Sequence, residues 1–148
     1  MINIYMLKKI RIYKYKILKK QIKQIVKLEN NKIYNINYIF CNNKYLLYIN
    51  KKFLNRQYYT DTITFNYNKD YNKNILYGDI FISVNQVYNN SIIWKVNFSI
   101  EMKRVIIHSL LHLIGYNDNN SLNKKEMKNK ENIYIKKLNK IIIKYDKI

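Results

Sequence analysis

The segment from residue 100 to residue 118 constrains this chain most, because it joins an apolar helix to both histidines of the sequence. Apolar side chains recur at helical spacing over residues 100–114, so we expect a helix packed in the core. His108 and His112 lie four positions apart, and side chains four apart project from one face of a helix, one turn above the other. Both imidazoles can therefore reach a single metal ion.

A turn and a carboxylate follow this helix. Gly115 predicts the helix end, since glycine is the usual residue just past the last turn. Asp118 comes after the turn, where the chain can double back toward the imidazoles. Two nitrogens and a carboxylate oxygen suit Zn²⁺ or a similar divalent ion, and three protein ligands leave one position open for water. The residues alone leave a second interpretation open, in which both histidines simply pack in the core.

The composition indicates one folded domain and a polyanionic partner. The chain has 148 residues, 48% of them hydrophobic, which is enough to form a core. Its net charge of +19, from 28 basic against 9 acidic residues, is typical of RNA- or DNA-binding proteins. However, the sequence is also rich in Lys, Asn, Ile and Tyr, residues with A- and T-rich codons. Because an AT-biased genome produces the same composition, the charge permits RNA binding without demonstrating it.

The cysteine content and the apolar runs predict a cytoplasmic protein. A single cysteine, Cys41, excludes an internal disulfide and fits a reducing compartment, where we expect it buried. Lys and Arg interrupt the N-terminal apolar residues, so no secretory signal is visible. Apolar stretches also fall short of the roughly 20 residues that cross a bilayer. We therefore expect no membrane association.

Periodicity along the chain predicts a mixture of strands and helices. The expected elements are a strand at 2–6, a helix at 16–28, a strand at 34–41, a helix from Asn42 or Asn43 to 54, a strand at 61–67, a loop at 68–77, a strand at 80–84, a helical region from about 85, the core helix at 100–114, and a last helix capped by Ser121. We therefore predict one α/β (α+β-like) domain over residues 1–148. It has a mixed sheet of about four strands packed with helices, and the metal site lies on a core helix.

Three segments together resemble the YbeY family of bacterial endoribonucleases that mature ribosomal RNA. The family signature H-G-x-L-H-L-x-G-Y, followed by Asp-His, is similar to the run H-S-L-L-H-L-I-G-Y-N-D at residues 108–118. The family elements T-D-x-x-[ST]-F and G-D-I-x-I-S match residues 60–65 and 78–83. Their order and separation also agree, and the resemblance covers roughly residues 34–135. A chance match of all three in order is improbable.

The sequence departs from the family pattern at three positions. The third metal-binding histidine of the family falls on Asp118, whose anionic oxygen should weaken the pull on a bound water. The small glycine after the first histidine is Ser109, which can either crowd the helix or form a hydrogen bond. The arginine that many relatives carry in a basic cleft is Leu54 here, and Arg56 stands two residues later. Whether Arg56 takes over that role is left open.

The resemblance implies a zinc-dependent, single-strand-preferring endoribonuclease. It would hold one Zn²⁺ by His108, His112 and Asp118, and act in the 3′ end maturation of 16S ribosomal RNA and in ribosome biogenesis, with pre-ribosomal particles and ribosome-associated proteins as partners. Arg56, Asp61 and Ser83 are the candidate RNA contacts. The zinc peptidase pattern H-E-x-x-H requires Glu where Ser109 stands, so a peptidase is disfavoured.

Two further function classes remain possible at this point. The first is a non-catalytic RNA-binding ribosome-assembly factor in which zinc only stabilises the fold. The second is a metal-dependent hydrolase with another substrate. The sequence does not indicate which group acts as the general base.

Overall fold

A mixed four-stranded sheet forms the centre of the computed structural model, which describes residues 1–70 and 73–145. Its strand order is β1 (Ile2–Met6), β3 (Lys32–Cys41), β5 (Ile75–Ser83) and β4 (Thr62–Asn66). β1, β3 and β5 run parallel, whereas β4 pairs antiparallel with β5 at one edge. The predicted α/β fold class with a mixed sheet of four strands is confirmed.

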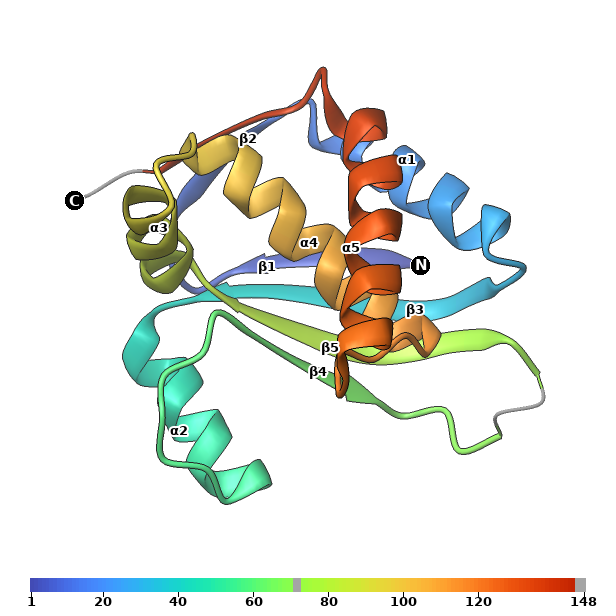
Figure 1. Cartoon of the computed structure of the whole chain (residues 1–148), viewed down its shortest axis with the longest axis horizontal. Coiled ribbons are helices and arrows are strands. Elements are labelled where there is room, and N and C mark those ends of the chain that lie inside the picture. The colour runs from blue at the N-terminus through green and yellow to red at the C-terminus, as the bar shows by residue number, and fades with distance from the viewer. Residues whose placement is uncertain (71–72, 146–148) are drawn as a thin grey trace.

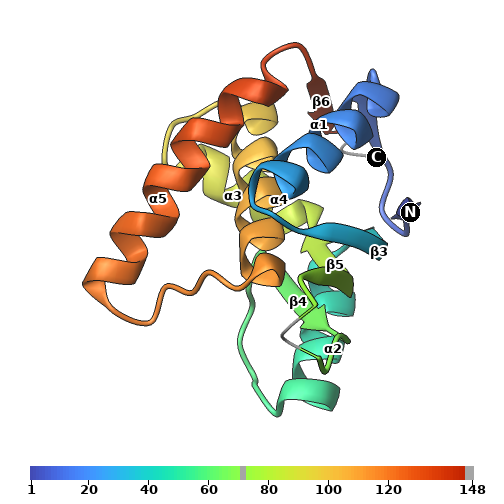
Figure 2. The ribbon, with the colours of Figure 1, turned by 90° about the vertical axis from the view of Figure 1, so that its right-hand side faces the viewer.

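Helices cover both faces of this sheet (Figure 1, Figure 2). In chain order they are α1 (Tyr15–Leu28), α2 (Asn43–Leu54), α3 (Val84–Ile93), α4 (Phe98–Ile114) and α5 (Ser121–Ile135). α1, α4 and α5 lie on one face, while α2 lies on the other (Figure 1). Among these helices of the described part, none is both long and apolar enough to cross a membrane.

Strict alternation along β5 builds a core on each face of the sheet. Ile80 and Ile82 are fully buried in the larger core, which also contains the apolar residues of α1 and α4. Phe81 points the other way and packs against the smaller core under α2. Cys41 is buried in that smaller core and is a free thiol, as expected from the sequence. Because both faces of the sheet are covered, β5 carries apolar side chains on both of its faces.

Gly78 lets α4 approach the sheet closely beside the candidate metal site. A Cβ atom at this position would lie 2.7 Å from the Leu113 Cδ1 atom of α4 and closer still to the carbonyl oxygen of Phe65 in β4. Only glycine leaves room for both neighbours. Because Leu113 follows His112, the glycine in β5 helps to set the position of the histidine-bearing helix.

The predicted elements are present, with shifted boundaries. β5 begins at Ile75, so the expected loop at 68–77 is shorter than predicted; its residues 71 and 72 lie outside the described residues. α4 begins at Phe98 rather than at residue 100. Ser121 is not the cap of the last helix: Asn120 has the extended backbone that a cap needs, and its side chain accepts a hydrogen bond from the Asn123 amide.

A second sheet was not predicted. β2 (Ile10–Tyr13) pairs antiparallel with β6 (Ile142–Tyr145), which follows a short 3₁₀ helix at Lys136–Leu138. Each strand is only four residues long. Strands this short show little periodicity, and their pairing joins opposite ends of the sequence, so the pattern within each segment could not reveal them.

Candidate metal centre

The two histidines and Asp118 come together at one point in the structure. His108 and His112 lie on one face of α4, with their Nε2 atoms 2.9 Å apart. Each Nε2 atom lies 3.8 Å from the Oδ2 atom of Asp118. One ligand atom from each of the three residues falls within 4.8 Å of the others. The side chain of Asp118 is 44% exposed, so this group opens to solvent on one side.

Hydrogen bonds at the far ring nitrogens set the tautomers of both imidazoles. The Nδ1 atom of His112 lies 3.1 Å from the carbonyl oxygen of Tyr116, which can only accept, so Nδ1 carries the proton. The Nδ1 atom of His108 lies 3.3 Å from the Oε2 atom of Glu131 and donates to this carboxylate. The 2.9 Å between the two Nε2 atoms is a hydrogen-bond distance and needs a proton on one of them; when both rings are neutral with the proton on Nδ1, both Nε2 lone pairs face the same point. This donor set fits a divalent metal ion.

The turn after α4 carries the carboxylate back to the histidines. Gly115 adopts a φ of 127°, which side-chain-bearing residues rarely adopt, and no heavy atom within 4 Å would oppose a Cβ there. The amides of Gly115 and Tyr116 both donate to the carbonyl oxygen of Leu111 at 3.0 Å. The chain therefore reverses directly after the helix, and Asp118 returns over its last turn.

Glu131 connects the site to a row of charges between α4 and α5. Its side chain is 10% exposed, and its Oε1 atom lies 3.9 Å from Nη1 of Arg104. Arg104 also pairs with Glu101 at 3.7 Å. Glu131 is not among the residues that the sequence pattern singled out. No local signal could have identified its role, because it stands 23 residues from its partner His108 and meets it only after α5 has packed on α4.

The two histidines have pKa values shifted in opposite directions. Burial lowers the pKa of His108, but the hydrogen bond and negative charge of Glu131, together with the charges of Asp61 and Asp118, outweigh burial, so its net pKa is raised. Burial and the nearby His108 together lower the pKa of His112. His112 is therefore the histidine whose neutral form, the form that binds a metal, is favoured.

A pocket of about 580 Å³ opens beside this group. Its wall is formed by α2, the α2–β4 loop, β4, α4 and the turn after α4. The lining residues are Asn50, Leu54, Arg56, Tyr58, Thr60, Asp61, Thr62, Ile63, Thr64, Asn66, His108, His112, Asp118 and Asn119. Asn50 anchors the α2–β4 loop through two hydrogen bonds. Its side-chain Nδ2 atom donates to the Tyr58 carbonyl at 2.9 Å, and its backbone carbonyl oxygen accepts from the Arg56 amide.

The three candidate RNA contacts have different surroundings. Arg56 and Asp61 both line the pocket, and so does Leu54, the position at which the resemblance led us to expect an arginine. Burial raises the pKa of Asp61. Ser83 lies elsewhere: its side chain is fully buried, accepts a hydrogen bond from the Gln86 amide at the start of α3 and donates to Asn43. Its hydroxyl caps a helix and is not accessible to RNA, so the structure corrects its assignment as an RNA contact.

Ser109 resolves one of the departures from the family pattern. Its side chain is fully buried, and its hydroxyl lies 2.8 Å and 3.0 Å from the carbonyl oxygens of Val105 and Ile106, one turn earlier in the helix. The hydroxyl is satisfied within α4, a common arrangement for a serine inside a helix. Thr64 of β4 in turn reaches the Ser109 carbonyl at 3.4 Å, which ties the helix to the pocket wall.

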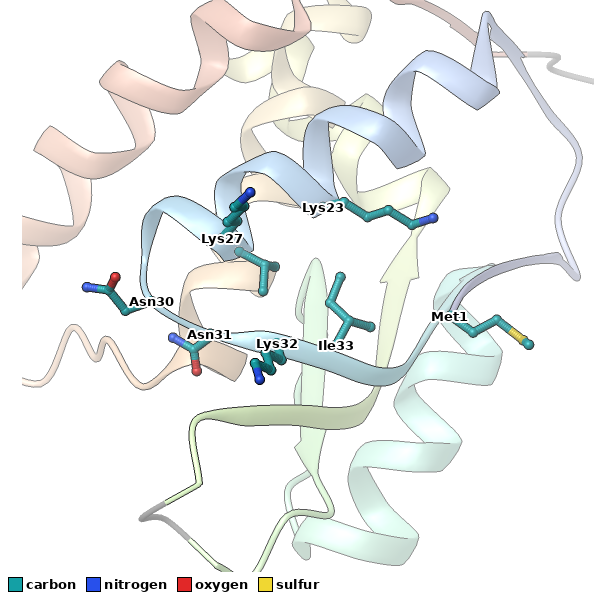
Figure 3. Close-up of a pocket in the computed structure, with 8 residues that line it drawn as sticks. Met1, Lys23, Lys27, Asn30, Asn31, Lys32 and Ile33 are labelled. Atoms are coloured by element: carbon teal, nitrogen blue, oxygen red, sulfur yellow. The ribbon is translucent and has the colours of Figure 1, made fainter.

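A second pocket of about 590 Å³ lies between α1 and β3 (Figure 3). The described residues that line it include three lysines but no histidine or carboxylate. The amines of Lys23, Lys27 and Lys32 point in different directions, so they do not converge on one ligand position (Figure 3). Of these two pockets, the one beside His108 and His112 has the chemistry of a reactive site.

Comparisons with known proteins identify the family of this chain. The family model described as Endoribonuclease YbeY matches residues 5–139. A protein named Endoribonuclease YbeY from Karelsulcia muelleri is 47% identical over 135 residues, covering 91% of this chain and 94% of the relative. One of the same name from Amoebophilus asiaticus is 41% identical over 120 residues, covering 81% and 80%.

Among solved structures, the solution structure of TM1509 from Thermotoga maritima superimposes with a TM-score of 0.67 at 28% identity. It covers 93% of this chain and 89% of that one. The family model spans most of this chain and the relatives share 47% and 41% of the aligned residues, so this chain belongs to the YbeY family.

Proposed function

We propose that this protein is a metal-dependent endoribonuclease that cleaves single-stranded RNA in the pocket beside α4. The observation that carries the proposal is the convergence of His108 Nε2, His112 Nε2 and an Asp118 oxygen at the mouth of that pocket. Three protein ligands suit Zn²⁺ and leave a coordination position for water or substrate. The relatives named as endoribonucleases support the reaction type.

The donor set accounts for the choice of metal. A bound Zn²⁺ would act as a Lewis acid on a phosphoryl oxygen and lower the pKa of a coordinated water towards roughly 7. Glu131 and the Tyr116 carbonyl hold the two imidazoles with their Nε2 atoms facing the pocket, so metal binding requires loss of the proton between these atoms but little movement of the rings. Asp118 supplies the negative charge that partly compensates the cation.

The pocket walls provide different contacts for a nucleic acid. Arg56 is exposed at the pocket and can bind a backbone phosphate. It would thereby serve the role of the arginine that many relatives carry at the position of Leu54. Asp61 can accept hydrogen bonds from a ribose hydroxyl or a base amino group, since a carboxylate would repel a phosphate. The net charge of +19 favours RNA binding through the backbone and makes that binding weaken with salt.

Ribosomal RNA is the substrate class we propose, with maturation of the 16S 3′ end as the reaction. It rests on family membership, and the cytoplasm is the compartment where this substrate occurs. Pre-ribosomal particles are the corresponding partners. The Asp118 side chain is 44% exposed, so the candidate metal ligands are accessible to a single strand within a large particle.

The test removes two of the proposed ligands together. We expect protein with His108→Ala and Asp118→Ala to lose cleavage of a fluorescent single-stranded RNA while its RNA affinity and melting temperature stay close to wild type. Asp70→Ala is the control, since this exposed carboxylate pairs with Lys73 outside the pocket and its loss should leave cleavage unchanged. Collapse of the fold in the double variant would instead support a structural metal in a non-catalytic assembly factor. Unchanged cleavage would refute the proposal.

A further inference from the structure

Glu29, at the end of α1, carries a carboxylate that three side chains from the last third of the chain surround. Its side chain is 7% exposed. Its Oε1 atom accepts a hydrogen bond from the Tyr116 hydroxyl, and its Oε2 atom accepts from the Tyr134 hydroxyl and, at 3.1 Å, from the Lys130 ammonium. Tyr116 belongs to the turn after α4, and the other two donors belong to α5. One buried carboxylate therefore joins three separate segments.

Both segments held by Glu29 also hold a histidine of the metal centre. The Tyr116 hydroxyl donates to Glu29, while the carbonyl of the same residue accepts from Nδ1 of His112 at 3.1 Å. α5 carries Lys130 and Tyr134 on either side of Glu131, whose Oε2 atom lies 3.3 Å from Nδ1 of His108. Two short paths thus lead from Glu29 to the two imidazoles.

We propose that Glu29 is a positioning residue of the metal centre, which fixes the two groups that orient His112 and His108. The inference rests on the proposed function and extends it to a residue outside the metal-binding motif. A carboxylate suits this role, because its two oxygens accept several hydrogen bonds from different directions. A neutral amide at the same place would keep one acceptor oxygen and turn an N–H group toward a donor.

A purely local role in ending α1 does not account for this side chain. The backbone of Glu29 already completes the helix end, since its amide donates to the Ile25 carbonyl at 3.0 Å. The side chain makes no part of that cap. A buried carboxylate is costly to desolvate unless it is fully paired, and here its three donors come only from segments that surround the metal centre.

The experiment measures metal affinity, which does not depend on catalysis. Metal-free wild type, Glu29→Gln and Tyr116→Phe are titrated with Co²⁺, followed by its visible absorption, and with Zn²⁺ in competition with a chelator. Tyr116→Phe removes only the hydroxyl and keeps the carbonyl that binds His112. Tyr67→Phe is the matched control, because its hydroxyl donates to the Asp79 carboxylate at 2.7 Å, away from the site.

We expect the dissociation constant of both site variants to rise about tenfold, as typical for groups that orient metal ligands, and that of Tyr67→Phe to stay within twofold. Affinities of Glu29→Gln and Tyr116→Phe within twofold of wild type would overturn the inference. If Glu29→Gln does not fold, Tyr116→Phe alone decides.

The metal titration, together with an RNA-cleavage assay on the same proteins, separates this inference from the proposed function. Wild type that binds metal but cleaves no RNA contradicts the nuclease proposal, while the affinity ratios still decide the role of Glu29. Wild type that binds neither Co²⁺ nor Zn²⁺ overturns both.

Discussion

Replacing Gly78 by alanine tests how closely β5, β4 and the histidine-bearing helix are packed. The new Cβ atom would lie 2.7 Å from Leu113 Cδ1, against the 3.4 Å at which ordinary van der Waals contact begins, and closer still to the Phe65 carbonyl oxygen. Leu113 can change rotamer, but the carbonyl belongs to a strand that is hydrogen-bonded to β5. The strands must therefore separate.

When the backbone cannot move to relieve overpacking, the substitution lowers the free energy of unfolding by about 3 kcal/mol, the upper part of the usual range. For a domain of this size each kcal/mol lowers the melting temperature by about 2–4 °C, so we expect Gly78→Ala to melt about 6–12 °C below wild type. Circular dichroism melts and urea titrations of the metal-free protein measure this loss directly.

Gly115→Ala is the comparison variant, because its Cβ meets no heavy atom within 4 Å and its cost comes only from the φ of 127°. That conformational cost is about 1–2 kcal/mol, so its melting temperature should lie between those of wild type and Gly78→Ala. The smallest decrease in melting temperature that we expect for Gly78→Ala is about 6 °C. A decrease of less than about 2 °C would refute the close-packing argument.

Three other variants test separate parts of the site. Glu131→Gln removes the charge 3.3 Å from His108 Nδ1, so we expect zinc affinity to fall about tenfold in competition titrations; unchanged affinity would contradict the orienting role. Burial raises the pKa of Glu101 from 4.5 to about 7. Between these two pKa values the folded protein retains a proton that the unfolded chain loses, so the free energy of unfolding of wild type falls as pH rises. Glu101→Gln has no ionisable group here, so its free energy of unfolding relative to wild type should rise by about 2 kcal/mol between about pH 5 and about pH 8 in urea titrations. A difference between the two proteins that does not change with pH would exclude a buried ionisation of Glu101. Arg56→Ala should weaken single-stranded RNA binding and reduce the slope of log K against log salt by about 0.7, whereas an unchanged slope would show that Arg56 binds no phosphate.

The grouping of the three candidate metal ligands could be predicted because their geometry is local. Two histidines four apart on a helix must share a face, and a glycine turn returns the next carboxylate toward them. These relations depend on residues 108–118 alone, so the sequence was sufficient to place His108, His112 and Asp118 together, and the structure has them within 4.8 Å.

The groups that orient those ligands could not be predicted, because they come from distant segments. Glu131 reaches His108 across 23 residues, and Glu29 reaches Tyr116 across 87 residues. Neither glutamate belongs to a sequence motif that would indicate its partner. The β2–β6 pair was missed for the same reason, since short strands at opposite ends of the chain specify each other only in the folded state. Ser83 illustrates the reverse error, because a matched motif gave no information on which way its hydroxyl points.

Metal content is the most direct test of the central claim that His108, His112 and Asp118 form a zinc site. Protein purified without chelator is analysed for bound elements, as wild type and as His112→Ala. The account predicts about one equivalent of zinc in wild type and almost none in the variant, as expected when one of three ligands is lost. Wild type that holds no metal even after incubation with zinc, or a variant that keeps its full equivalent, would contradict the account.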